Sequence, residues 1–416
     1  MNLRKDGVKS FLMPMWWAAG LTLIFFLSGY AAWGELPWVE LQRSTAMLSG
    51  VGIAYLASIV IVYQLDRSDI GRLHLGVVLA TVVGAFAVLA LILLFSRAYY
   101  SRTFILLAMG FAMFWLKVGQ WLSHRLFLPR LAVMPAAVRP EVLHARDAEW
   151  VPLARPELPD EALSGLVANR DSKDEEWQRL YIKCKMKGIP IYHGATVSEQ
   201  VTGRMSLERL SEGHILDRTV PIGYAFFKRV TDLVVPLCLA PAFLPLILLT
   251  GIVIKLDSPG PMFFCQPRVG LGGQQFRMIK LRSMHVDAEK DGARFAHQAD
   301  HRVTRVGRLI RRLRIDELPQ FWNVLKGEMS IIGPRPEQVE FVMRLQTSIP
   351  FYGYRHVVRP GIAGWAQTLQ GYADSETAAQ AKLEYDLYYV KNCSLWLDLL
   401  IVFRTFHTIF TGHGAR

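Results

Sequence analysis

The chain has 416 residues, of which 52 % are hydrophobic and only 20 % are charged. With a positive mean hydropathy, this composition is typical of a membrane protein. The formal net charge of +12 suits anionic partners, such as nucleic acid, acidic lipid headgroups or phosphorylated substrates. The four cysteines form no CxxC pair and have no metal-ligand spacing with histidine, which argues against a disulfide framework and a structural zinc site.

Residues 1–128 predict a membrane bundle of four transmembrane helices. Its apolar stretches cover about 11–33, 45–65, 75–95 and 103–123, each about long enough to cross a hydrocarbon core. Arg125, Arg130 and Arg139 follow the fourth stretch, whereas Glu35 and Glu40 lie in the loop between the first two. The positive-inside rule therefore predicts that both ends of the bundle are cytoplasmic. Almost no ionisable residues lie within the stretches, which favours an anchor over a transporter.

Residues 129–220 predict a linker followed by a small cytoplasmic α/β domain. From Pro129 to about Pro159 the chain is rich in proline, alanine and arginine, which is typical of a linker. Beyond it, residues 162–168 and 189–192 have strand-like patterns and residues 174–187 a helical one. This βαβ fragment lacks a Gly-rich phosphate loop, so we expect a packing or regulatory domain rather than a dinucleotide site.

A long apolar run near 228–256 opens the last region, 221–416. Basic residues stand at both flanks, including Lys228 and Lys255, and they favour placing both ends on the cytoplasmic side. Three prolines interrupt the run, and each removes a backbone donor and kinks a helix. A re-entrant helix that enters the membrane, bends near Pro241 and returns satisfies both observations. The alternative is an ordinary fifth span, which would place the basic region beyond it outside.

The remaining polar region is dense in arginine and contains two adjacent acids. Lys280 and Arg282 lie in KLRSM, an arginine-rich run precedes Asp316 and Glu317, and Arg335 lies in GPRP. The planar fork of arginine suits phosphate oxygens, and several together suit a diphosphate. A nucleic-acid surface could use the same charges, but no groove-reading motif accompanies them.

The two acids are expected at the start of a helix. The pattern predicts a helix from Asp316 to Lys326 that stops at Gly327, with Asp316 at the N-cap and Pro319 in the first turn. Helix N-termini favour anions, so bound phosphate and an ionised Asp316 would both be stabilised there. Taken alone, the pair fits equally well an ordinary N-cap aspartate beside a solvent-facing Glu317.

Residues from about 227 to 416 closely resemble the bacterial sugar transferase family, the monotopic phosphoglycosyl transferases. The matching stretches are KRVTD, IKLDSPGPMFF, QPRVGLGG, FRMIKLRSM, RVGRLIRRLRIDELPQFWNVLKGEMSIIGPRPE, VRPGIAGWAQ and LEYDLYYVKNCSLWLDL. The preceding helices and small domain are similar to the large members, such as undecaprenyl-phosphate glucose phosphotransferases. The closing GHGAR and the GYADSETAAQAKLEYDLYY stretch are similar to members of exopolysaccharide clusters.

This resemblance implies a fold and a reaction. The fold is a re-entrant membrane helix with a mainly α-helical monotopic catalytic domain on the cytoplasmic face of the bacterial inner membrane. The reaction transfers hexose-1-phosphate from a UDP-sugar to undecaprenyl (polyprenyl) phosphate and releases UMP, as the first membrane step of exopolysaccharide or capsule repeat-unit assembly. Glucose, galactose and an N-acetylated hexose all remain open as the sugar. The implied partners are membrane lipid, downstream glycosyltransferases and a second copy of the chain, without nucleic acid.

The resemblance also implies residue roles. Asp316 matches the family's nucleophile and Mg²⁺ ligand, and Glu317 matches its paired acid. Arg311 and Arg335 match phosphate-binding arginines, as Lys280 and Arg282 match a basic substrate-binding pair. Pro241 matches the proline that breaks the re-entrant helix. A non-catalytic membrane scaffold or regulator of polysaccharide assembly is the alternative function, and it would predict loss of the acid pair, which is intact.

Overall fold

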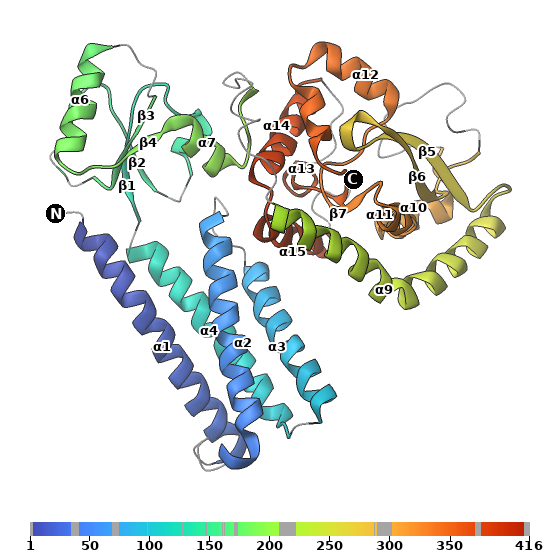
Figure 1. Cartoon of the computed structure of the whole chain (residues 1–416), viewed down its shortest axis with the longest axis horizontal. Helices are drawn as coiled ribbons and strands as arrows, with labels where there is room; N and C mark the ends of the chain where they lie inside the picture. Colours follow the sequence, from blue (N-terminus) through green and yellow to red (C-terminus); the bar gives the residue numbers. More distant parts are fainter. Residues whose placement is uncertain are drawn as a thin grey trace. The chain divides into compact units, whose positions relative to one another are not determined.

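The computed structural model describes residues 3–34, 41–68, 75–97, 99–126, 128–145, 148–159, 161, 163–169, 174–207, 222–286, 288, 302–370 and 376–411. The chain divides into two compact units, Met1–Gly203 and Arg204–Arg416 (Figure 1). Glu35, Glu40, the expected boundary at 220/221 and the closing GHGAR lie outside the described residues, as do residues 371–375.

The first unit begins with four apolar helices, as predicted. They are α1 (Leu3–Trp33), α2 (Leu41–Ser68), α3 (Leu75–Ser96) and α4 (Arg102–Leu126). Within the described residues, α1, α2 and α4 each contain a stretch long and apolar enough to cross a membrane, and the apolar stretch of α3 is the shorter Thr81–Ser96. Large apolar side chains such as Ile53, Phe95 and Leu106 are exposed, as expected of helices whose outer surfaces face lipid.

Glycine allows α1 and α4 to pack closely. The rings of Trp16 and Trp115 stack with centroids 4.1 Å apart, and Trp115 Nε1 donates to the carbonyl of Trp16 at 3.0 Å. A Cβ at Gly20 would lie 2.3 Å from Trp115, and one at Gly119 would lie 2.4 Å from Trp16. Small residues at such crossings let membrane helices approach where lipid supplies no hydrophobic driving force.

The rest of the first unit is a parallel four-stranded sheet. Its strands, in the order β2-β1-β3-β4, are β2 (Glu149–Pro152), β1 (Arg130–Val133), β3 (Gly165–Ala168) and β4 (Ile191–His193). The helices between and after them are α5 (Pro140–Leu143), α6 (Glu175–Met186) and α7 (Gly194–Thr202). The predicted helix is α6, whose N-cap Asp174 accepts a hydrogen bond from the N–H of Glu176. Trp177 and Leu180 of α6 are buried in a core with Leu166 of β3.

The prediction of a linker from Pro129 to Pro159 was wrong. This segment supplies two strands of the sheet, the interior strand β1 and the edge strand β2. Its prolines occupy places that tolerate a missing N–H, since Pro152 lies on the edge strand and Pro140 is the first residue of α5. A proline-rich composition therefore did not distinguish a linker from short, proline-bounded strands.

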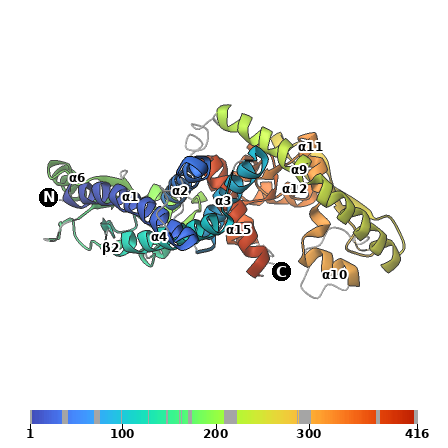
Figure 2. The same cartoon turned by 90° about the horizontal axis from the view of Figure 1, so that it is seen from below.

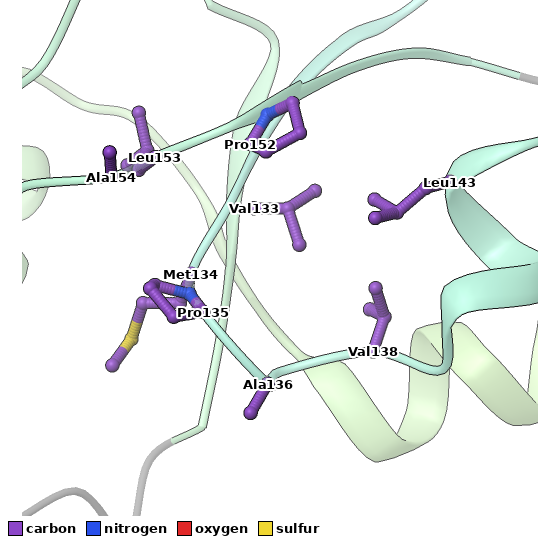
Figure 3. Close-up of a pocket in the computed structure, with 9 residues that line it drawn as sticks. All are labelled: Val133, Met134, Pro135, Ala136, Val138, Leu143, Pro152, Leu153 and Ala154. Carbon is purple, nitrogen blue, oxygen red and sulfur yellow. The ribbon is translucent and has the colours of Figure 1, made fainter.

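A pocket of about 270 Å³ opens where β1 and β2 end (Figure 3). The nine residues that line it are all apolar, among them Val133, Leu143 and Pro152. The carboxyl edge of a parallel sheet is the usual place for a ligand in α/β folds. An entirely apolar set of side chains suits an apolar group better than it suits a dinucleotide.

Among its described residues, the second unit combines one long helix with shorter helices and two small sheets. Its strands are β5 (Phe263–Val269), antiparallel to β6 (Gln275–Leu281), and β7 (Ser330–Ile332), parallel to β8 (Gly361–Ala363). Its helices are α9 (Ile222–Asp257), α10 (Arg305–Arg312), α11 (Gln320–Lys326), α12 (Val339–Ser348), α13 (Trp365–Leu369), α14 (Glu376–Asn392) and α15 (Leu395–Thr411). Short 3-10 turns are η3 (Leu271–Gly273), η4 (Ile315–Glu317) and η5 (Tyr352–Val357).

The helix α9 is continuous through three internal prolines, Pro236, Pro241 and Pro245. Its 36 residues would extend about 54 Å if straight, well beyond a hydrocarbon core of about 30 Å. Figures 1 and 2 show instead that α9 bends in its middle part. A bend is the expected effect of proline inside a helix, so the predicted break takes the form of a bent helix rather than an interrupted one.

Three charged residues attach the first half of α9 to other elements of the second unit. Arg229 donates to two carbonyls in the last turn of α11 at 2.8 and 2.9 Å. Asp232, which is buried, accepts from a hydroxyl and a backbone N–H of β7 at 3.0 and 2.9 Å. Lys228 forms an ion pair with Asp398 of α15 at 2.9 Å. The KRVTD motif thus joins the apolar helix to α11, which follows the acid pair, and to β7 and α15.

Candidate active site

The two acids lie in a short turn between two helices. Asp316 and Glu317 belong to η4, which follows α10 and precedes α11. The prediction that Asp316 caps a helix over 316–326 was wrong, because α11 begins at Gln320 and Pro319 occupies its N-cap. The acids are buried within the loop, so their surroundings and not a helix terminus determine their ionisation.

Three basic groups converge on one oxygen of Glu317. Its Oε1 lies 2.8 Å from Arg335 Nη2, 3.2 Å from Arg314 Nη1 and 3.9 Å from Lys280 Nζ. Burial alone would favour the neutral acid, but the charges of Arg335, Lys280 and Arg314 outweigh it and hold the pKa of Glu317 well below its usual range. Glu317 is therefore a fixed negative charge that gathers cations around it.

The same surroundings shift the pKa of Asp316 upward, opposite to the shift of Glu317. Burial, followed by the charge of Glu317, raises the pKa of Asp316 to about 6, against the opposing charges of Lys280, Arg335 and Arg311. Its Oδ1 is buried and accepts no hydrogen bond from the described residues. Asp316 is thus mostly ionised at pH 7, with one carboxylate oxygen left for another atom to bind.

Lys280 reaches the acids from β6. Burial, followed by the charge of Arg335, lowers the pKa of Lys280 to about 8. Asn323 of α11 fixes the neighbouring strand, because it accepts from the N–H of Ile279 at 3.1 Å and donates to a second backbone group of β6 at 2.8 Å. Our sequence reasoning missed Asn323, whose only signal is a polar residue in the apolar pattern of FWNVL. It holds the lysine strand against the helix that follows the acids.

Arg335 enters the cluster from the GPRP turn after β7. Gly333 begins this turn where a Cβ would lie 2.3 Å from the carbonyl of Arg359, so no larger residue fits there. The prolines on either side of Arg335 restrict the backbone further. The predicted phosphate-binding arginine therefore contacts Glu317 from a constrained loop.

Two arginines come from the end of α10 and the residues after it. The predicted Arg311 lies in the last turn of α10, close enough for its charge to lower the pKa of Asp316. Arg314, to which the sequence assigned no role, has φ of +57°, a left-handed conformation that is uncommon for a residue with a side chain. Its guanidinium is nevertheless directed at Glu317, so Arg314 belongs to the site.

Arg282 does not join this cluster, in contrast to the prediction. It is 5 % exposed, and its guanidinium donates to the carbonyls of Ser258 and Pro259 at 2.6 Å each. It also donates to the hydroxyl of Ser258 at 3.0 Å. Because β6 ends at Leu281, Arg282 lies outside the strand that carries Lys280 and binds the two residues directly after α9 instead.

The cluster carries a net positive charge. Its members are the acids Asp316 and Glu317 and the bases Lys280, Arg311, Arg314 and Arg335. Four positive and two negative charges leave +2 when all six groups are ionised. Such a site favours a doubly anionic ligand, such as a diphosphate ester.

A magnesium ion fits this donor set only if the substrate supplies further ligands. Within the described residues, no group of three or more His, Cys, Asp or Glu side chains could hold a metal ion. Mg²⁺ is commonly bound by one or two carboxylates together with substrate phosphates and waters. The unpartnered Oδ1 of Asp316 matches that pattern, whereas Glu317 is occupied by basic groups.

Comparison with known proteins identifies the family. Residues 223–412 match the model of the bacterial sugar transferase family. The UDP-N-acetylgalactosamine-undecaprenyl-phosphate N-acetylgalactosaminephosphotransferase of Aeromonas hydrophila is 42 % identical over 386 residues, which are 92 % of this chain and 91 % of the relative. The UDP-glucose:undecaprenyl-phosphate glucose-1-phosphate transferase of Caulobacter vibrioides is 43 % identical over 190 residues, 45 % of this chain and 71 % of the relative.

A third relative is named for the polymer. The exopolysaccharide production protein PSS of Rhizobium leguminosarum is 39 % identical over 184 residues, 43 % of this chain and 92 % of the relative. Only the Aeromonas protein, among these three, is matched across the N-terminal helices as well as the region of the acid pair. The chain belongs to the bacterial sugar transferase family, as an enzyme of the undecaprenyl-phosphate sugar phosphotransferase kind.

Proposed function

We propose that the chain transfers a hexose-1-phosphate from a UDP-sugar to undecaprenyl phosphate, with an aspartyl-phosphosugar intermediate. The observation that carries this proposal is Asp316, a buried carboxylate with one unpartnered oxygen within a cluster whose net charge is +2. Exopolysaccharide or capsule repeat-unit assembly would begin with this step, in keeping with the name of the Rhizobium relative.

The first half-reaction uses Asp316 as the nucleophile. An oxygen of its carboxylate attacks the β-phosphorus of the UDP-sugar, and the bond from that phosphorus to the bridging oxygen breaks. UMP leaves with the bridging oxygen and its electron pair. The neighbouring bases neutralise the charge that develops on the phosphate oxygens.

The second half-reaction frees the enzyme. An oxygen of undecaprenyl phosphate attacks the same phosphorus, the bond to the Asp316 carboxylate breaks, and undecaprenyl diphosphate sugar is released. Two steps suit this site because both substrates are anionic, and the cluster then neutralises them one after the other. Both bond changes occur at phosphorus, so no oxidation or reduction is required.

Glu317 acts by holding the basic groups in place rather than by moving a proton. Its low pKa makes it a weak base, and Arg335, Arg314 and Lys280 all converge on its Oε1. Asp316 and the substrate phosphates would hold Mg²⁺, which supplies further neutralisation of the transferring phosphoryl group.

The test is UMP release before any lipid acceptor is added. Purified protein in phospholipid nanodiscs free of polyprenyl phosphate should release about one UMP per active site in a single burst and then stop until undecaprenyl phosphate is supplied. Asp316→Asn should abolish the burst, since its amide is not a nucleophile at phosphorus. Asp232→Asn is the matched control, because Asp232 is another buried aspartate but lies on α9 outside the cluster. Lipid-linked sugar formed by Asp316→Asn at near-normal rate would refute the covalent mechanism, and a wild-type protein inactive with every UDP-sugar would favour the scaffold alternative.

For the sugar, we propose N-acetylgalactosamine. The relative that matches along 92 % of this chain is named for UDP-N-acetylgalactosamine, whereas the glucose-transferring Caulobacter relative matches 45 %. Competition between UDP-N-acetylgalactosamine and UDP-glucose in the burst assay decides between them. A larger burst rate with UDP-glucose would reject this assignment while leaving the reaction type intact.

We also propose that α9 is re-entrant and that the second unit faces the cytoplasm from the inner membrane. Its bend and its length beyond one bilayer crossing support this topology. Cysteines introduced at Gly223 and Gln274, after replacing the four native cysteines by serine, should both resist a membrane-impermeant reagent applied from the periplasm. Labelling of Gln274→Cys alone would indicate an ordinary span. Pro241→Leu should straighten α9 and place Gln274→Cys within reach of the reagent.

Two further partners follow from this placement as proposals. The lipid-linked product must pass to glycosyltransferases that extend it on the same membrane face. A second copy of the chain is the other candidate partner, and the oligomeric state in nanodiscs tests it.

A further inference from the structure

The loop that carries Arg335 is fixed at four successive carbonyls. Each carbonyl of Pro334–Glu337 accepts a hydrogen bond. Backbone N–H groups of β8 and β5 bind the first and the last of them at 2.9 and 3.0 Å. Two arginine side chains, Arg355 and Arg268, bind the middle two at 2.8 and 3.1 Å. The loop is therefore held from both sides at the residue that contacts Glu317.

Arg355 is the more deeply buried of the two arginines. Its side chain is 2 % exposed, and its Nη2 donates both to the carbonyl of Arg335 and to Asp386 at 2.7 Å. Its Nη1 donates to the hydroxyl of Tyr352 at 2.7 Å. Asp386 comes from α14 and is itself buried, so three separate segments of the chain meet at this guanidinium.

Arg268 approaches the loop from β5. Its Nη1 donates to the carbonyl of Pro336 and lies 3.8 Å from the carboxylate of Glu337, while its Nη2 donates to the side chain of Gln266 at 2.6 Å. Glu337 also pairs with Lys382 and lies 3.9 Å from Arg355. The two arginines thus share one half-buried acid at the end of the loop.

Stability alone gives a weak reason for so many buried charges. Burying an ion pair costs desolvation energy that often equals its attraction, so such pairs are poor evidence of a stabilising role. A functional side chain, by contrast, must be held within a fraction of an ångström by its supporting shell. Here both arginines donate hydrogen bonds to carbonyls of the constrained turn and not to Glu317, so they act on the geometry of the turn.

We propose that Arg268 and Arg355 are positioning residues of the transfer reaction, which act only by holding the guanidinium of Arg335 against Glu317. This inference rests on the proposed function, because it assigns the effect to the phosphate-binding cluster. It predicts that loss of either arginine matters only while Arg335 is present.

A double-mutant cycle measures this dependence. Arg355→Lys and Arg268→Lys each keep the charge but lose the planar fork, and each should lower kcat/KM of UMP release about tenfold in the parent. In an Arg335→Ala background the same substitutions should change kcat/KM by less than about twofold, since the group that they position is gone. Each variant is assayed with the UDP-sugar that the parent protein uses best. The thermal unfolding midpoint of each variant is also measured, to establish that the variant is folded.

Arg282→Lys is the matched control. Arg282 is also a buried arginine that donates to two backbone carbonyls, but these belong to Ser258 and Pro259, directly after α9. Its effect should be the same factor with and without Arg335. Equal factors for Arg355→Lys in both backgrounds would overturn the proposal, because they would indicate a general structural role. If Arg355→Lys does not fold, Arg268→Lys decides by the same criterion, and a parent that releases no UMP would reject the proposed function instead.

Discussion

Replacing Arg335 by alanine removes the shortest contact that Glu317 makes with a basic group. The hydrogen bond from Arg335 Nη2 to Glu317 Oε1 is 2.8 Å long, and the two side chains are 22 % and 9 % exposed. A charge-assisted hydrogen bond of this kind contributes about 1.5–3 kcal/mol, which corresponds to about a ten- to hundredfold loss in rate. Lys280 and Arg314 remain near the same oxygen, so activity should fall but not vanish.

The assay is a rapid-quench measurement of the UMP burst in nanodiscs, with Arg335→Ala, Arg335→Lys and the parent at equal active-site concentration. Arg335→Lys should recover only part of the loss, because an ammonium lacks the planar fork. The reasoning would be refuted if folded Arg335→Ala released UMP within twofold of the parent rate. It would also be refuted if lysine restored full activity, since charge alone would then suffice.

Three further predictions follow from the same geometry. The rate of UMP release should have a bell-shaped pH profile with limbs near pH 6 and pH 8. Below pH 6 Asp316 is protonated and no longer a nucleophile, and above pH 8 Lys280 loses its charge. A profile that is flat from about pH 5 to 9 would contradict this prediction. Arg314→Ser should lower kcat/KM for the UDP-sugar about three- to tenfold, an effect that steady-state kinetics can separate from unchanged activity. Arg229→Ala should destabilise the protein by about 1–2 kcal/mol, because two carbonyls of α11 lose their hydrogen-bond donor. The thermal unfolding midpoint should fall by roughly 2–8 °C, and an unchanged midpoint in detergent would contradict this prediction.

The sequence predicted those parts of the site that depend on short motifs. Each of Asp316, Glu317, Lys280 and Arg335 lies in a short motif that resembles the family's, which is why the sequence could identify them. Tertiary contacts between β6, η4 and the turn after β7 then bring their side chains together. Arg282 shares a motif with Lys280, and a longer strand would place both on one face, but β6 ends at Leu281 and Arg282 binds Ser258 and Pro259 instead. Residue spacing alone does not reveal where a strand stops.

Long-range contacts were the other limit of sequence reasoning. Arg355 and Asp386 lie 31 positions apart, and neither pattern nor composition indicates that both are buried under the GPRP turn. The left-handed backbone of Arg314 was equally hidden, since non-glycine residues rarely adopt it. The apolar helices, by contrast, can be predicted from the composition of about twenty consecutive residues, because that prediction depends on no tertiary contact.

The attachment of both halves of α9 has a mechanical consequence. Arg229 joins the first half to the helix after the acids, and Arg282, which follows the strand of Lys280, binds the two residues directly after the helix. Any change in the angle of the bend would therefore shift the lysine relative to the acids. A helix that adapts to its bilayer by tilting or bending would transmit bilayer thickness to this distance. For a re-entrant α9, as proposed above, lipid acyl-chain length should therefore change the rate of the reaction.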